Sequence, residues 1–159
     1  MARSGPRPPA TPLSHPSVRV AAVVAGFHRE IAERLLDGAR GRLVEAGLAD
    51  ENLDVRWVPG AFELPLAAQE MARRGHYAAV IALGLVVRGE TAHFDYICNT
   101  ASTGLSRVGL DTGVPCAFGV LTTENQAQAE ARAGGAVGNA GADAADAAVA
   151  MINLLAEER

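Results

Sequence analysis

The chain contains no lysine, and all 14 of its basic residues are arginine. A Walker-type phosphate loop is therefore excluded, because its lysine binds the nucleotide phosphates. Enzyme-bound Schiff bases are excluded as well, which removes lysine aldolases and pyridoxal-phosphate enzymes. Any phosphate group bound by this protein must be held by arginine side chains and backbone N–H groups.

Other features are scarce, and each absence removes a class of protein. Aromatic residues make up only 4% of the chain and the formal charge is −4, so we expect no nucleic-acid interface. No uninterrupted apolar run approaches 18 residues, so we expect no membrane span. No apolar stretch follows Arg3 and Arg7, which predicts that the start is not a secretory signal and that the protein is cytoplasmic.

The chain has two cysteines, Cys98 and Cys116. Neither has another cysteine or a histidine at the spacing of a metal site, so no metal is expected. A nucleophilic thiol is the alternative, but an isolated cysteine between Ile97 and Asn99 is more typical of packing. Both are interpreted as reduced, structural thiols.

The length of 159 residues fits one domain, preceded by an arm. Residues 1–17 hold five of the eight prolines and little that could pack, which predicts a flexible arm before a domain over 18–159. Strands alternate with helices in that domain, which predicts a four-stranded parallel sheet in a three-layer α/β/α fold of flavodoxin-like type. The expected strands are 18–25, 53–58, 77–87 and 114–122, and the expected helices are 28–46, 62–74, 92–110, 124–132 and 141–157.

In an open parallel sheet the ligand crevice lies beyond the carboxyl ends of the strands. The loops expected there cover 26–28, 59–63, 84–93 and 122–124, and they hold most of the unusual residues of the chain. We therefore predict a single site at this edge of the sheet.

The segment 86–96 has the strongest pattern of these loops. After a buried strand come a glycine, a threonine that can cap a helix, and His93 in the expected first helical turn. Free N–H groups and the positive helix end favour an anion, and they also favour a neutral imidazole that can accept a proton. The segment predicts an anion site beside a base, with a capped helix and a surface histidine as the alternative.

Three further residues have two interpretations each. Phe27 could stack on a planar ligand or pack under the following helix. Glu63 could bind hydroxyl groups or only favour the start of a helix electrostatically. Arg132 could bind an anion or be solvated. His15, His28 and His76 are interpreted as arm, loop or surface residues.

Three long motifs, in order and at matching spacings, resemble the lumazine synthase family of riboflavin biosynthesis over residues 18–155. They are Pro-Gly-Ala-Phe-Glu-Leu-Pro at 59–65, the stretch Gly-Leu-Val-Val-Arg-Gly-Glu-Thr-Ala-His-Phe-Asp-Tyr at 84–96, and Asp-Thr-Gly-Val-Pro at 111–115 leading to Phe-Gly-Val-Leu-Thr-Thr at 118–123. Arg-Ala-Gly at 132–134 and Gly-Asn at 138–139 follow at the family's spacing.

The resemblance implies condensation of 5-amino-6-(D-ribitylamino)uracil with 3,4-dihydroxy-2-butanone 4-phosphate to give 6,7-dimethyl-8-ribityllumazine. It implies neither an organic cofactor nor a metal. It also implies a homopentamer with sites between neighbouring subunits, a sixty-subunit shell in many members, and riboflavin synthase as a protein partner. The short link 132–141 permits the shell without requiring it.

The resemblance assigns a role to each matching residue. His93 would transfer the proton, Phe27 would stack on the pyrimidine ring, and Glu63 would accept from ribityl hydroxyls. Arg132 and the backbone of Glu90 and Thr91 would hold the phosphate. Ala61 and Phe62 would line the ribityl pocket, and the strand end Leu85, Val86 and Val87 would contact the ring through its backbone. Phe118 would also contact the substrate. Phe118 and Arg132 would both come from an adjacent subunit.

The chain departs from the family pattern around the phosphate site and the stacking aromatic. Gly26 and His28 stand where arginine and asparagine are common, and Ala131, Ala136 and Ala140 replace a glutamate and two lysines. The three alanines, which remove an acid and nearby bases, predict weaker phosphate affinity. They also leave open a non-catalytic flavin or lumazine carrier, or container, on the same fold. A response-regulator-like domain is disfavoured, because it needs a lysine and an acidic cluster after the first strand.

Overall fold

The computed structural model describes residues 6–158. The central sheet has four strands, β1 (Val20–Ala25), β2 (Leu53–Val58), β3 (Ala79–Val87) and β4 (Cys116–Thr123). The helices are α1 (Arg29–Glu45), α2 (Leu64–Arg73), α3 (His93–Thr112), α4 (Gln126–Arg132) and α5 (Ala140–Glu157), with 3-10 turns η1 (Asp50–Asn52) and η2 (Ala61–Glu63) and a short hairpin of β5 (Ala133–Gly135) and β6 (Gly138–Asn139).

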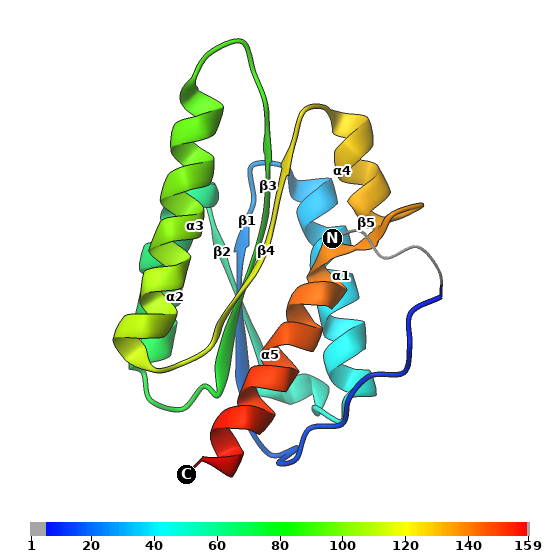
Figure 1. Cartoon of the computed structure of the whole chain (residues 1–159), viewed down its shortest axis with the longest axis vertical. Helices are drawn as coiled ribbons and strands as arrows, with labels where there is room; N and C mark the ends of the chain where they lie inside the picture. Colours follow the sequence, from blue (N-terminus) through cyan, green and yellow to red (C-terminus); the bar gives the residue numbers. More distant parts are fainter. Residues whose placement is uncertain (1–5, 159) are drawn as a thin grey trace.

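All neighbouring strands of the main sheet are parallel, in the order β2-β1-β3-β4. Helices α2 and α3 cover one face, and α1, α4 and α5 cover the other (Figure 1). The expected three-layer, flavodoxin-like α/β fold is confirmed. The direction of winding reverses between β1 and β3, and that reversal is where open parallel sheets form their ligand crevice.

The core consists of two apolar layers because successive side chains of the buried strands point to opposite faces. Every residue of β1 is buried, as are the first seven of β3. Ala22 and Val24 pack toward α1 and α5, whereas Ala21 and Val23 pack toward α2 and α3. Strands buried on both faces read as continuous apolar runs, which is why the sequence predicts them well.

Element boundaries differ from expectation by small amounts, and the turn η1 and the hairpin β5/β6 were not predicted. The first, third and fourth strands each begin two residues later than expected, at Val20, Ala79 and Cys116, and the second helix begins with η2. The glycine-rich link forms the antiparallel hairpin β5/β6. Its side chains are too small for an alternating pattern, so periodicity gives no signal there.

Residues 6–17 run along α1 and α5 without regular secondary structure (Figure 1). Leu13 is buried in the core, and its N–H donates to the carbonyl of Ala46 at 2.8 Å. Asn153 accepts from the N–H of Ser14 and donates to the carbonyl of Pro12, both at 2.9 Å. The sequence did not predict these contacts. Residues 1–5 of the proposed arm lie outside the described residues, and its flexibility stays a prediction.

Helices in the described part of the chain are either too short or too polar to cross a membrane. Within the same residues, no group of three or more histidine, cysteine, aspartate or glutamate side chains is arranged to hold a metal ion.

Helices α1 and α5 cross so closely that a glycine is required at their contact. A Cβ on Gly141 would overlap the carbonyl oxygen of Leu35, a backbone atom that cannot rotate away. We expect Gly141→Ala to lower the free energy of unfolding by about 1–3 kcal/mol through overpacking. Gly41→Ala is the matched control, because nothing lies within 4 Å of its Cβ. Urea unfolding should find the control neutral or up to about 1 kcal/mol more stable. Equal effects would contradict the close contact.

Candidate active site

The carboxyl ends of the strands carry the loops that the sequence singled out. The loop from β3 to α3 rises above this edge of the sheet, beside the turn from β4 to α4 (Figure 1). Because β1 and β3 are neighbours, Phe27 after β1 and the last residues of β3 flank the point where the winding reverses.

A cavity of about 280 Å³ lies at this point. Eight of the twelve predicted site residues line it: Phe27, Ala61, Phe62, Glu63, Leu85, Val86, Val87 and His93. They come from four separate segments of the sequence, and the remaining lining residues are His28, Gly60 and Ile97. The lining is mostly apolar, with a few polar side chains, as in pockets that bind a planar organic ligand.

Two aromatic rings are left unpacked at the rim of this cavity. Phe27 is 81% exposed and Phe62 is 58% exposed. Phe27 therefore does not pack under the following helix, which was the alternative interpretation. Its only aromatic neighbour in the described chain is His28, edge to face at 5.0 Å between centroids. The free face of Phe27 can accept a flat ring in offset stacking.

Glu63 fixes the turn that supports one wall of the cavity. Its Oε2 accepts from the N–H of Gly60 at 2.9 Å, and this bond closes η2 before α2 begins. Within residues 6–158 its Oε1 accepts no hydrogen bond, so this oxygen can accept from a ligand hydroxyl. Both interpretations of Glu63 are therefore compatible with its geometry.

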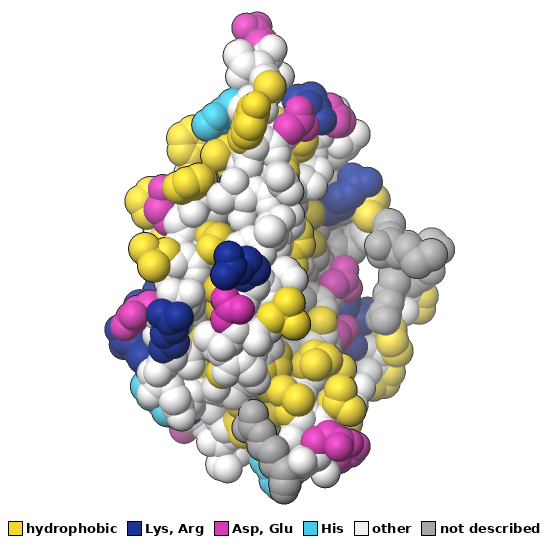
Figure 2. Space-filling view, turned by 60° about the vertical axis from the view of Figure 1, so that its left-hand side comes forward, with side chains coloured by type: hydrophobic (Ala, Val, Ile, Leu, Met, Phe, Trp, Pro, Cys, Tyr) yellow, Lys and Arg dark blue, Asp and Glu magenta, His cyan; other side chains and the backbone are white. Residues whose placement is uncertain are grey.

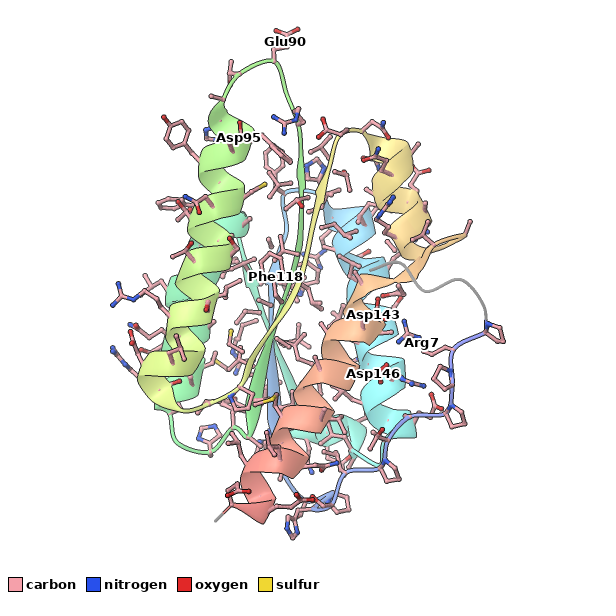
Figure 3. The ribbon with its side chains drawn as sticks, viewed as in Figure 1. Arg7, Glu90, Asp95, Phe118, Asp143 and Asp146 are labelled. Atoms are coloured by element: carbon pink, nitrogen blue, oxygen red, sulfur yellow. The ribbon has the colours of Figure 1, made fainter. Side chains whose placement is uncertain are left out.

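His93 is the first residue of α3, with Ala92 rather than Thr91 at the N-cap. The Thr91 hydroxyl still accepts from the N–H of His93 at 3.4 Å. In the described chain the N–H groups of Glu90 and Thr91 have no acceptor, which leaves them available for an anion. Glu90 and Thr91 are exposed and do not line the 280 Å³ cavity; Glu90 stands at the tip of the loop (Figure 3).

Arg88 holds the base of this loop. Its Nε donates to Glu124 at 2.8 Å, its Nη1 donates to Asp95 at 3.4 Å, and its guanidinium lies over the ring of Phe94 at 4.3 Å. Its backbone N–H donates to Thr123 at 2.8 Å. Arg88 thus connects the end of β3 to β4 and to the first turn of α3, which positions His93.

His28 also lines the cavity, although the sequence analysis interpreted it only as an arm, loop or surface residue and not as part of the site. It is half-buried, and burial lowers the pKa of its imidazole below the ordinary value. It also occupies the N-cap of α1. The signal that could have identified it was its position, directly after the aromatic residue that follows β1.

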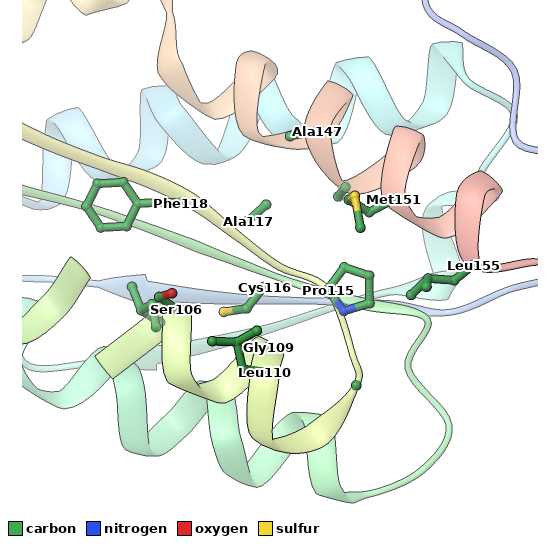
Figure 4. A pocket seen from close by; sticks show the side chains of 13 residues that line it. Ser106, Gly109, Leu110, Pro115, Cys116, Ala117, Phe118, Ala147, Met151 and Leu155 are labelled. Atoms are coloured by element: carbon green, nitrogen blue, oxygen red, sulfur yellow. The ribbon is translucent and has the colours of Figure 1, made fainter. Parts of the chain in front are cut away.

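Phe118 lies away from this cavity, in an apolar groove of about 510 Å³ between α3 and α5 along the edge strand β4 (Figure 4). It is 45% exposed and shares the groove with Met151 and Leu155 of α5 and Leu110 of α3. Within one chain, therefore, Phe118 is not brought together with His93.

Arg132 ends α4 and lines a third cavity, of about 190 Å³, with Asn139 and Asp143. Its Nη1 donates to the carbonyl of Gln128 at 3.1 Å, and among the described residues it forms no ion pair. Its other N–H groups remain available to an anion. Like Phe118, Arg132 is not brought to His93 within one chain.

The two cysteines have the character of structural thiols. Burial raises the pKa of the Cys116 thiol to about 12 and also raises that of Cys98. The thiolate is the nucleophilic form, so neither side chain is prepared for attack at neutral pH.

The 280 Å³ cavity therefore combines a stacking ring, a carboxylate oxygen, a strand end and an imidazole beside unpaired N–H groups. It can hold a flat polar ring and move a proton, without any group prepared for covalent catalysis. The model of the 6,7-dimethyl-8-ribityllumazine synthase family matches residues 17–156. The chain belongs to this family, which serves riboflavin biosynthesis.

Proposed function

We propose that this protein condenses 5-amino-6-(D-ribitylamino)uracil with 3,4-dihydroxy-2-butanone 4-phosphate to give 6,7-dimethyl-8-ribityllumazine. The observation that carries the proposal is the convergence of Phe27, Glu63 and His93 on one cavity at the reversal of the sheet. The pyrimidine would stack on Phe27, the ribityl hydroxyls would donate to Glu63, and the backbone of Val86 would meet the ring edge.

The reaction needs positioning and proton transfer more than a reactive side chain. The 5-amino group attacks the ketone, inorganic phosphate and two waters leave, and the ribitylamino nitrogen closes the second ring. Holding both reactants in register can contribute about 7–11 kcal/mol to lowering the barrier. His93 would carry protons between the reacting atoms, which typically contributes about 10²–10⁴-fold.

We infer that the phosphate is held by Arg132 and by the backbone N–H groups of Glu90 and Thr91. Free donors at both places support this inference. Because these groups lie apart within one chain, the complete site requires Arg132 and Phe118 of a neighbouring subunit. Ala136 and Ala140 provide no charge near Arg132, so we expect a weaker phosphate affinity than a lysine-bearing relative would have.

We also propose that the protein assembles into homopentamers and into a sixty-subunit shell. A cytoplasmic location and riboflavin synthase as a partner are further parts of this proposal. Exposed apolar side chains support the assembly, since they cost free energy unless they are covered. Leu110, Phe118 and Met151 are 82%, 45% and 41% exposed around the groove beside β4. Figure 2 shows hydrophobic side chains gathered over the lower part of one face. Light scattering measures the assembly size.

The direct test is to mix the purified full chain with both substrates and follow lumazine absorbance and fluorescence. Formation of lumazine above the uncatalysed rate supports the enzyme. The alternative is a carrier that binds lumazine or riboflavin, and it predicts ligand binding at the uncatalysed rate of product formation. Release of inorganic phosphate in proportion to lumazine gives a second, independent readout.

Replacing Arg132 by alanine should affect one substrate selectively. We expect Arg132→Ala to raise the KM for the butanone phosphate about 10- to 100-fold, because a charge-assisted bidentate contact is lost, and to leave the KM for the uracil within about threefold. Steady-state kinetics with each substrate varied in turn gives both values. Equal increases in the two constants would instead assign Arg132 to the fold or the interface.

A further inference from the structure

The N-terminal arm places an arginine against Asn139 and Asp143, two of the residues that line the cavity of Arg132. Arg7 donates through Nη2 to Asp143 at 2.6 Å and through Nη1 to Asp146 at 2.8 Å, and its Nη2 also lies 3.3 Å from the carbonyl of Asn139. Figure 3 places Arg7 beside both aspartates of α5. Asp143 lines the same 190 Å³ cavity as Arg132.

The two aspartates depend on Arg7 to different degrees. Asp146 also accepts from the buried Arg42 at 2.5 Å, so Asp146 would still have a cationic partner if Arg7 were removed. Asp143 has Arg7 as its only cationic partner in the described chain. A carboxylate without that partner would repel an anion in the cavity and would attract the guanidinium of Arg132, which forms no ion pair among the described residues.

The arm is held so that Arg7 stays in this place. The N–H of Ala10 donates to Glu45 at 3.0 Å, and Leu13 is buried against the core on the same side of the molecule. These contacts fix the chain on the C-terminal side of Arg7, which limits the conformational entropy lost when its guanidinium binds.

We propose that Arg7 is a positioning residue for phosphate binding: by pairing with Asp143 it keeps Arg132 available to the phosphate of the substrate. This inference rests on the proposed role of Arg132. It assigns to the arm a role in the reaction that needs no contact with either substrate.

The test measures binding of inorganic phosphate by calorimetry, and KM for each substrate, in the full chain. Arg7→Ala should weaken phosphate binding and raise the KM for the butanone phosphate about two- to fivefold, as expected for a partly exposed ion pair, with kcat unchanged. Arg7→Lys should restore most of the affinity. The effect should shrink as salt is raised, because exposed charges are screened.

The double variant Arg7→Ala with Asp143→Asn distinguishes charge from folding. If Arg7 acts through Asp143, removing the carboxylate should return phosphate affinity to within about twofold of the original value. If Arg7 only anchors the arm, the double variant stays as weak as Arg7→Ala, and the inference is overturned. Arg40→Ala is the control for net charge, since Arg40 pairs with Asp50 at 2.6 Å outside this cavity; it should bind phosphate normally.

Arg132→Ala separates failure of this inference from failure of the proposed function. If Arg132→Ala weakens phosphate binding and Arg7→Ala does not, only the role of Arg7 is wrong. If Arg132→Ala leaves phosphate binding unchanged, the proposed phosphate site is wrong, and the role of Arg7 falls with it.

Discussion

His93→Ala should slow turnover about 10- to 1,000-fold while binding of a riboflavin-like ligand persists. The imidazole borders the cavity at the start of α3 and is the only histidine beside the loop with unpaired N–H groups in the described chain. Its removal abolishes one route for proton transfer but leaves the stacking ring, the strand end and Glu63 in place. The residual rate is expected from positioning alone.

Two measurements check this prediction. Single-turnover formation of lumazine gives the rate, and quenching of riboflavin fluorescence gives the affinity. His76→Ala is a matched control, because His76 lies before β3, outside the cavity, and should change neither quantity. A normal rate in His93→Ala would remove His93 from the mechanism and direct attention to His28, the other histidine that lines the cavity.

The sequence predicted the sheet because its signal is local. A strand buried on both faces is a run of apolar residues, and the runs of β1 and β3 were predicted to within two residues of their observed bounds, Val20–Ala25 and Ala79–Val87. The hairpin β5/β6 was missed because its stability depends on partners far away in the sequence. Arg34 of α1 donates to the carbonyl of Ala133 at 2.8 Å, and the amide of Asn139 donates to the carbonyl of Arg34 at 3.0 Å.

The part of the site that the order of the strands positions could be predicted from the sequence. Parallel strands place their carboxyl ends at one edge, so residues following β1, β2 and β3 had to converge, and eight of the predicted residues do line one cavity. Glu90, Thr91, Phe118 and Arg132 do not line it. For Phe118 and Arg132 we propose a place across a subunit contact, and the strand order of one chain carries no signal for such a contact. The position of Arg7 was also beyond prediction, since its partners lie 136 and 139 positions later in the chain.

Because Arg132 and His93 lie apart within one chain, reassembling two weakly active variants together should produce the largest recovery of activity that we predict. His93→Ala and Arg132→Ala proteins, each weakly active at low concentrations of the butanone phosphate, should regain activity when they are unfolded and reassembled together. If each site takes His93 from one subunit and Arg132 from the next, random mixing in equal amounts restores both groups at about one quarter of the junctions in a ring. The mixture should then reach about one quarter of the original activity.

Mixing the same two folded proteins without unfolding is the control, and it should give only the mean of their separate activities. A second control reassembles the original protein with the double variant His93→Ala and Arg132→Ala. Sites shared between neighbours again predict about one quarter of the activity, whereas sites within one chain predict about one half. No recovery in the first reassembly together with about one half in the second would place His93 and Arg132 in a site within one chain, and the apolar groove that contains Phe118 would then need another explanation than contact with a neighbouring subunit.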